Sequence, residues 1–110
     1  EEYRNALKGI RNVGLQNKDI ARRKKIAWLV SVLVDKNKRD IILQKLKEAG
    51  IDARAFFIPL SEMEIYKKYA RECVRSKEIS EMGINLPTTK KVSGKVLERI
   101  VDIFYEYCER

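Results

Sequence analysis

The sequence predicts an α+β domain in which a small, mainly antiparallel sheet carries helices on one face. Apolar segments with strand character, such as residues 26–34, alternate along the chain with amphipathic segments of helical period. The chain has 110 residues, of which 45% are hydrophobic, so it is long enough for one core and too short for two. Strands separated by helices in so short a chain favour a sheet with its helices packed on one side.

The N-terminal residues 1–9 are expected to be the last turns of a helix, because Gly9 is a typical helix stop. We assign them to the tail of an interdomain helix and residues 10–110 to the domain itself. The missing initiator methionine suggests a piece of a longer polypeptide. Residues 13–16 can form a short first strand.

Residues 26–34 are nearly continuously apolar and rich in β-branched residues, which predicts a strand covered on both faces. Its Trp28 is expected to anchor the core of the sheet, because large aromatic residues are mostly buried. A helix starting at Asn37 or Asp40 follows, and Gly50 supplies its left-handed stop.

The next strand, residues 51–58, should end at Pro59, because proline cannot donate a ladder hydrogen bond. Ser61 is then placed to cap a helix over residues 62–70, with Glu64 at the capping-box position. Three further elements are expected: a helix over residues 74–82, a strand over residues 84–87 and a closing helix capped by Ser93.

The net charge of +8 allows two interpretations. A basic chain can bind nucleic acid or another polyanion, but basic and acidic residues are interleaved here, as in a solvated surface. The sequence contains two cysteines, Cys73 and Cys108, and no histidine, which excludes common zinc spacings and a Cys–His nucleophile pair. No apolar run approaches membrane-spanning length, and free thiols are expected in a cytoplasmic protein.

The segment from Gly50 to Ser61 carries the strongest candidate binding residues. Arg54 offers a forked, permanently charged donor for a carboxylate or phosphate, although a surface acid could equally pair with it. Adjacent residues of a strand point to opposite faces, so one of Phe56 and Phe57 can fill the core while the other lines a pocket.

These residues form a pattern that resembles the C-terminal small domain of the DegT-type (DegT/DnrJ/StrS) sugar aminotransferases. The family segment Gly-Ile-x-x-Arg-Pro-Phe-Phe-x-Pro is followed by Leu or Met and then His or Ser. It is matched here by Gly50, Ile51, Arg54, Phe56, Phe57, Pro59, Leu60 and Ser61. A later family segment is matched by Cys73, Ser76, Ile79, Ser80, Gly83, Ile84, Leu86 and Pro87. Ala55 and Val74 stand where the family often has proline.

The resemblance implies the small domain of an enzyme that uses pyridoxal phosphate (PLP) to aminate a keto sugar on a nucleotide carrier. Such a parent would be a homodimer and would bind the nucleotide sugar and the amino donor through a large domain that this chain lacks. No lysine here stands in a context like that of the catalytic lysine, so the chain alone is not expected to bind PLP. The resemblance places Arg54, Phe57, Ser61 and Tyr66 near the substrate. The alternative function is a free-standing basic module for nucleic acid or another polyanion, which we do not favour.

Overall fold

The computed structural model describes residues 1–17, 21–88 and 91–109. Its elements are α1 (Glu2–Leu7), β1 (Gly14–Leu15), β2 (Val30–Leu33), α2 (Lys36–Glu48), β3 (Arg54–Ala55), the 3₁₀ helices η1 (Leu60–Glu62) and η2 (Glu64–Tyr69), α3 (Val74–Met82), β4 (Gly83–Leu86) and α4 (Gly94–Cys108). Within these residues the strands form one antiparallel sheet in the order β1-β2-β4-β3. The predicted α+β class with an antiparallel sheet is therefore confirmed.

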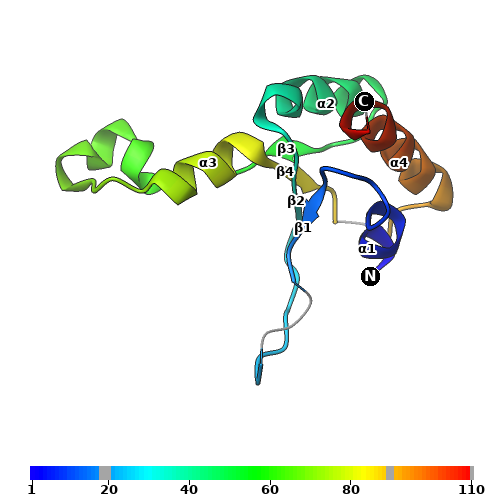
Figure 1. The fold of residues 1–110 in the computed structure, drawn as a ribbon, viewed down its shortest axis with the longest axis horizontal. Coiled ribbons are helices and arrows are strands. Elements are labelled where there is room, and N and C mark those ends of the chain that lie inside the picture. Colours follow the sequence, from blue (N-terminus) through cyan, green and yellow to red (C-terminus); the bar gives the residue numbers. More distant parts are fainter. Residues whose placement is uncertain (18–20, 89–90, 110) are drawn as a thin grey trace.

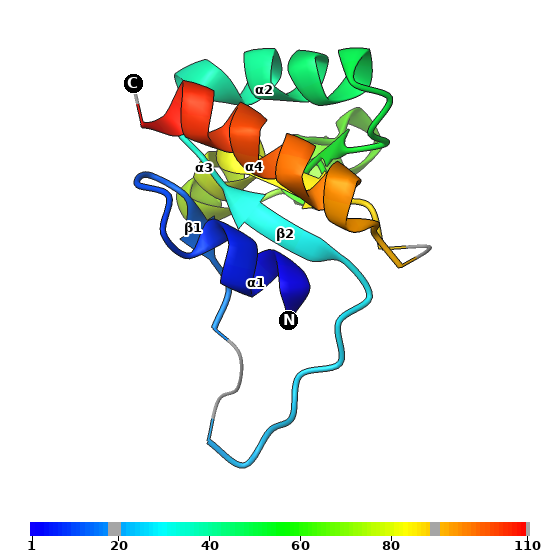
Figure 2. The ribbon, with the colours of Figure 1, turned by 90° about the vertical axis from the view of Figure 1, so that its right-hand side faces the viewer.

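Helices α1, α2 and α4 all lie on one side of the sheet, whereas α3 leads away on the other side (Figure 1). The view turned by 90° shows α4 running between α2 and α1 across the face of β2 (Figure 2). Helix α4 packs against both of these helices. These three helices thus form a single layer over the sheet, as the sequence predicts, but α3 does not join it.

The core lies between the sheet and this helix layer. Val32 of β2 and Ile84 of β4 are cross-strand partners, and both are fully buried beneath the helices. Side chains alternate between the two faces of a strand, so the neighbouring Ser31 and Asn85 point to the opposite face. The helices contribute a further set of fully buried side chains: Leu7, Ile42, Leu46, Ile100 and Phe104.

Local signals fix the ends of two helices that cover the sheet. Asp35 caps α2 by accepting a hydrogen bond of 2.7 Å from the backbone amide of Asn37. The same helix ends before Gly50, whose φ of +75° is the left-handed conformation that glycine tolerates. Ser93 caps α4 through the backbone amide of Val96, at 3.4 Å. The predicted glycine stop and Ser93 cap are confirmed.

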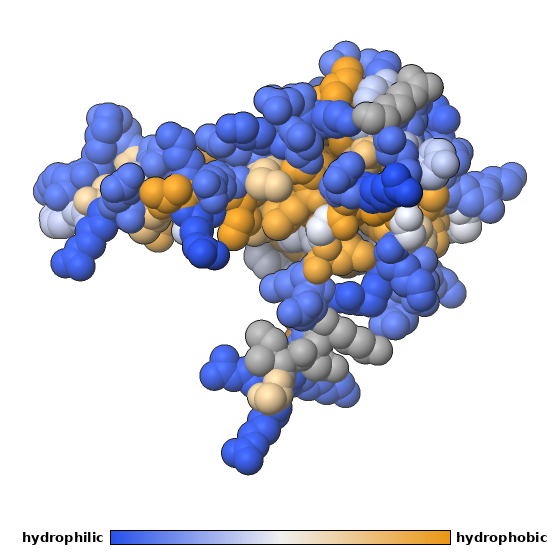
Figure 3. Space-filling view, viewed as in Figure 1, coloured by the Kyte–Doolittle hydropathy of each residue, from blue (hydrophilic) through white to orange (hydrophobic). Residues whose placement is uncertain are grey.

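Two segments project from the body of the molecule, whose overall extents, projections included, are 47 × 37 × 26 Å. One is the hairpin extension, residues 21–29, which reaches away from the sheet (Figures 1 and 2). The other is the arm, residues 60–82, which contains η1, η2 and α3 (Figure 1). Both projections are largely hydrophilic on the face shown in Figure 3, whereas hydrophobic atoms gather on the body.

The prediction for Trp28 is wrong. Strand β2 begins only at Val30, and Trp28 is 77% exposed rather than part of the core. The strand that pairs with this side of β2 is β1, which spans only Gly14–Leu15, and the helix layer does not reach the hairpin extension. Trp28 therefore lies in the hairpin extension, where no described helix or strand covers it.

Two predictions between residues 51 and 70 also need correction. The predicted strand over residues 51–58 pairs only at Arg54–Ala55, with one further backbone bond of 3.0 Å from the amide of Phe56 to the carbonyl of Gly83. The predicted helix over residues 62–70 consists of two 3₁₀ helices, because i→i+3 bonds begin at Pro59. Ser61 lies inside the first of them and caps nothing.

Candidate functional site

Arg54 lies on the edge strand β3, opposite Asn85 of β4. Its guanidinium contacts the Asp52 carboxylate through two bonds of 3.4 Å, and both side chains are about three-quarters exposed, at 77% and 76%. An exposed ion pair with such long contacts contributes little free energy of folding. The guanidinium can therefore exchange Asp52 for another anion at small cost.

The two adjacent phenylalanines lie just beyond β3, and their ring centroids are only 5.8 Å apart, so strand alternation does not send one of them into the core as expected. Phe56 is half-buried and packs directly on Gly83, where a Cβ atom would lie 2.4 Å from the Phe56 Cβ. Phe57 is 57% exposed and stacks on Trp28, with ring centroids 6.1 Å apart and an interplanar angle of 22°. This arrangement makes Phe57 the surface-facing aromatic residue of the pair.

Arg54, Phe57 and Trp28 line one open cavity of about 310 Å³. Asn85 and Thr88 add polar groups to its lining. The lower end of the usual range for ligand pockets is roughly 300 Å³. The cavity thus combines an aromatic wall, the Arg54–Asp52 ion pair and uncharged polar groups within one small volume.

Hydrogen bonds hold the polar side of this cavity in place. The Thr88 hydroxyl donates to the backbone carbonyl of Trp28 at 2.9 Å, which ties the hairpin extension to the end of β4. The Ser31 hydroxyl donates to the Asn85 side-chain oxygen at 2.7 Å, and Asn85 is buried. Buried amides are normally paired in this way.

The remaining candidates, Ser61 and Tyr66, lie on the arm and are not among the residues that line the cavity. Tyr66 is exposed, and Ser61 is half-buried. The structure therefore brings together Arg54 and Phe57, and it does not bring Ser61 and Tyr66 to the same cavity. Their predicted contact with the substrate depends on how the arm is covered in a larger assembly.

Three residues that line the cavity were not predicted from the sequence: Trp28, Asn85 and Thr88. Asn85 had a usable signal, because it is a polar residue between Ile84 and Leu86 in an otherwise apolar strand. Trp28 was assigned to the core from its residue type alone. The basic run Arg22–Lys25, which ends three residues before Trp28, is the sign in the sequence that this segment lies at the surface.

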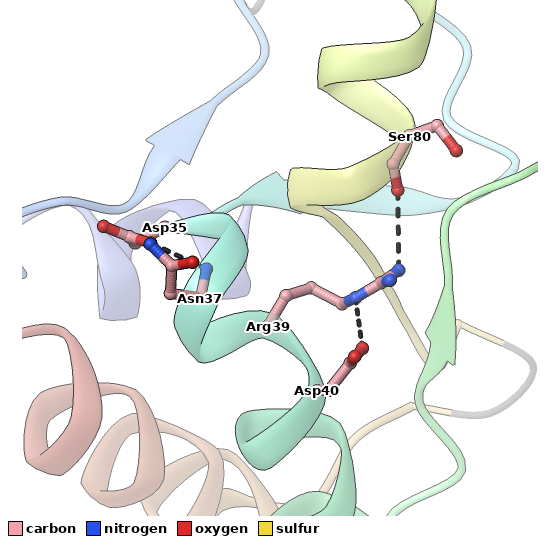
Figure 4. Close-up of polar contacts among 5 residues, drawn as sticks. All are labelled: Asp35, Asn37, Arg39, Asp40 and Ser80. Carbon is pink, nitrogen blue, oxygen red and sulfur yellow. Dashed lines mark hydrogen bonds and ion pairs between the residues drawn. The ribbon is translucent and has the colours of Figure 1, made fainter.

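A polar clasp joins the arm to the helix layer (Figure 4). Arg39 of α2 donates through Nη1 to the backbone carbonyl of Ser80 in α3, at 3.4 Å. Its Nε lies 2.7 Å from the Asp40 carboxylate, an ion-pair contact that is poorly directed as a hydrogen bond. The Arg39 side chain is only 18% exposed, so the clasp fixes the C-terminal end of α3 against α2.

Neither cysteine has the surroundings of a nucleophile. Cys73 is exposed and Cys108 is buried, and both are free thiols. Burial raises the pKa of the Cys108 thiol; nearby Lys38 lowers it to a smaller extent, and the acids Glu109 and Asp35 add to the rise. The described residues contain no cluster of three or more metal-ligating side chains, and no described helix is long and apolar enough to cross a membrane.

Comparison with protein families gives a match over residues 1–105 to the DegT/DnrJ/EryC1/StrS aminotransferase family. A comparison with curated proteins finds no match.

Solved structures share the fold. The chain is similar to the aminotransferase TlmJ from Streptoalloteichus hindustanus, with a TM-score of 0.82, 16% identity, and coverage of 94% of this chain and 28% of TlmJ. For DesV of S. venezuelae, solved with a ketimine intermediate, the TM-score is 0.79 and the identity is 24%, with coverage of 99% of this chain and 30% of DesV. For PseC of Helicobacter pylori, an aminotransferase of pseudoaminic acid biosynthesis, the TM-score is 0.78 and the identity is 16%, with coverage of 98% of this chain and 30% of PseC. The chain thus spans less than a third of each of these proteins.

Proposed function

Because the chain belongs to the DegT/DnrJ/EryC1/StrS aminotransferase family, we propose that it is the C-terminal small domain of a PLP-dependent aminotransferase. The parent enzyme would aminate a keto sugar on a nucleotide carrier. The observation that carries this proposal is the family match over residues 1–105, in a chain that spans only 28% of TlmJ and 30% of DesV. In this proposal residues 1–9 are the tail of an interdomain helix and residues 10–110 the small domain.

The residues of this chain do not fit a covalent PLP site. The imine to PLP needs a lysine held in a desolvated pocket, where its amine can lose its proton. Among the described residues, no lysine is buried. Lys24 and Lys25 line a second cavity of about 250 Å³, where Glu1 is the only acid among the described lining residues. We therefore assign the cofactor to a part of the parent protein outside this chain.

The role of this chain would be to close one side of the substrate site. Arg54 and Phe57 supply a cation and an aromatic surface in one cavity, while Ser61 and Tyr66 sit on the projecting arm. Closure of a small domain over a cofactor domain excludes water while the amino group moves. We further expect the parent to be a homodimeric cytoplasmic enzyme.

The test uses the full-length parent protein with PLP, L-glutamate and a nucleotide-linked keto sugar. We expect release of 2-oxoglutarate that requires both PLP and the keto sugar. The 110-residue chain incubated with PLP and borohydride serves as the control, and mass spectrometry should show no stoichiometric lysine adduct. A full-length protein that binds no PLP, or a stoichiometric adduct on the short chain, would refute the proposal.

Polyanion binding is the competing function, favoured by the exposed basic run Arg22–Lys25 on the hairpin extension. Elsewhere the basic residues are interleaved with acids, as at Arg39 and Asp40. A filter-binding assay with duplex and single-stranded nucleic acid separates the two functions. Tight binding with a steep salt dependence would favour the polyanion module.

A further inference from the structure

Helix α1 is held at the base of the hairpin extension, although it has only six residues. A helix this short is not stable by itself in water, so its tertiary contacts keep it in place. Tyr3 is 7% exposed and Leu7 is fully buried, which anchors α1 in the core. Figure 2 shows α1 beside β1 and β2, the two strands from which the hairpin extension emerges, and Tyr3 and Arg4 share the lining of one cavity with Leu15 and Val30 of these strands. The contacts of α1 therefore bear directly on the extension.

Two hydrogen bonds connect Tyr3 to Trp28 by way of the end of β4. The Tyr3 hydroxyl donates to the backbone carbonyl of Pro87 at 2.8 Å. The Thr88 hydroxyl donates to the backbone carbonyl of Trp28 at 2.9 Å. The Pro87 carbonyl belongs to the planar peptide unit that leads into Thr88, so holding this carbonyl also restricts the backbone of Thr88. Thr88 is exposed and its bond competes with water, so the bond depends on Tyr3 keeping Thr88 in place.

Arg4 holds the other strand at the base of the extension. Its guanidinium donates through Nη2 to the backbone carbonyl of Gln16, which directly follows β1. Arg4 is the neighbour of Tyr3 on α1, so two consecutive side chains of one helix act on both strands that carry the extension. Two points of attachment fix an orientation, whereas a single point would leave a pivot.

We propose that α1 sets the orientation of the hairpin extension, with Tyr3 acting through Thr88 on one strand and Arg4 acting on the other. Trp28 stands on this extension and lines the candidate cavity, where it stacks on Phe57. A displacement of α1 is therefore transmitted to the aromatic wall of the cavity. Tyr3 and Arg4 are positioning residues, because neither is among the described residues that line this cavity. The inference goes beyond the proposed function, since it holds for any ligand.

Trp28 reports on the orientation of the extension, since it is the only tryptophan of the chain. Time-resolved fluorescence anisotropy of the 110-residue chain separates a held Trp28 from one that rotates freely. Phe57→Leu removes the stacked ring and gives the reference signal of a released Trp28. Thr88→Val should raise the rapidly depolarised fraction of the emission by about twofold or more, in line with the loss of one hydrogen bond. Tyr3→Phe should raise this fraction too, and by no more than Thr88→Val does.

Double variants separate one shared route from independent effects. Tyr3→Phe combined with Thr88→Val should release Trp28 no further than Thr88→Val alone, because both changes interrupt the same route. Arg4→Met keeps the aliphatic part of the side chain and removes the bond to Gln16. Since Arg4 acts on the other strand, its effect should add to that of Thr88→Val.

Tyr107→Phe and Arg99→Met on α4 are the matched controls. They remove a half-buried tyrosine hydroxyl and an exposed guanidinium from a groove between α2 and α4, and both should leave the Trp28 anisotropy unchanged. Circular dichroism verifies that each variant is folded. Three results would overturn the proposal: unchanged anisotropy in both Tyr3→Phe and Thr88→Val, additive effects of these two changes, or equal release of Trp28 in the controls.

The consequence for the parent enzyme rests on the proposed function, in which α1 is the tail of the interdomain helix. In the full-length parent, Tyr3→Phe should raise the KM for the keto sugar and leave kcat nearly unchanged, because Tyr3 positions the cavity wall and does not touch the reacting groups. An unchanged KM would refute this consequence. Release of Trp28 in the short chain together with an inactive parent would refute the proposed function and leave the link between α1 and Trp28 intact. An active parent whose short chain shows no release of Trp28 in either variant would do the reverse.

Discussion

Phe56 packs closely on Gly83 of β4 and so joins the candidate binding segment to the sheet. The backbone of Gly83 passes under the Phe56 ring, so a Cβ atom at this position would lie 2.4 Å from the Phe56 Cβ and 2.7 Å from its Cγ. It would also lie 3.0 Å from the Ile79 carbonyl oxygen. Any side chain at residue 83 must therefore push Phe56 and the adjoining Phe57 outward.

Gly83→Ala is expected to lower the free energy of unfolding by about 1–3 kcal/mol, the usual cost of overpacking. Urea denaturation followed by circular dichroism measures this change. Gly94→Ala is the control, because no atom lies within 4 Å of a Cβ at that position. If both variants are equally stable, the tight contact between residue 83 and Phe56 is absent in solution.

Tyr3 provides a pH-dependent contribution to stability. Burial, aided by the neighbouring Glu2, raises its pKa from 10.0 to about 12, and its hydroxyl donates to the Pro87 carbonyl at 2.8 Å. The folded state therefore keeps a proton that the unfolded state loses. This stabilisation is complete below pH 10 and disappears as the pH rises through about 12.

The Tyr3→Phe variant isolates this contribution from the other tyrosines and lysines that titrate in the same range. Near neutral pH the wild type should exceed the variant in free energy of unfolding by about 0.5–1.5 kcal/mol, the net value of one hydrogen bond. The difference should shrink between pH 10 and 12. A difference that stays constant over this range would contradict the raised pKa of Tyr3.

At the scale of elements, α3 and α4 differ sharply in how they are held. Helix α4 buries Ile100, Ile103, Phe104 and Cys108, whereas α3 has no buried residue. The Arg39 clasp and a backbone bond of 3.0 Å from Val34 to Met82 fix only the C-terminal end of α3. Segments with few buried contacts open locally at low free energy. Helix α3 is thus less stabilised by burial than α4.

Hydrogen exchange should therefore be much faster in α3 than in α4, which peptide-resolved mass spectrometry measures. Arg39→Met keeps the aliphatic packing of the side chain but removes the bond to Ser80. It should further accelerate exchange in α3 and leave α4 unchanged. Lys47→Met on α2 is the control, because Lys47 is exposed and is not one of the clasp residues, and it should leave exchange in α3 unchanged. Equal protection of α3 and α4 would show that the arm is held by more than the clasp.

Helix ends could be predicted from the sequence because the residues that form them act locally, whereas burial could not. Asp35, Gly50 and Ser93 act through their own backbone, so helix ends near them are visible in the sequence. Burial depends instead on what other segments cover, which is why Trp28 was misplaced. Arg54 and Phe57 were recognised through a local motif. The cavity they share also needs Trp28, Asn85 and Thr88, which only the tertiary fold brings to the same place.

At the scale of the whole molecule, the net charge of +8 has a functional meaning if the ligand carries a diphosphate. The excess positive charge attracts anions over distances comparable to the Debye length, about 10 Å at 0.1 M salt. The attraction adds to the local charge of Arg54 and is shared by charges far from the cavity. The overall charge can therefore raise the rate of capture without any further contact.

In the full-length parent, we accordingly expect the KM for the nucleotide-linked keto sugar to rise severalfold as ionic strength increases from about 0.05 to about 0.5 M, since screening removes the long-range attraction. Arg99→Gln should reduce this salt dependence only slightly, whereas Arg54→Gln should remove a larger part of it, because Arg54 lines the candidate cavity. If the KM does not change with ionic strength, the basic surface plays no part in capturing the substrate.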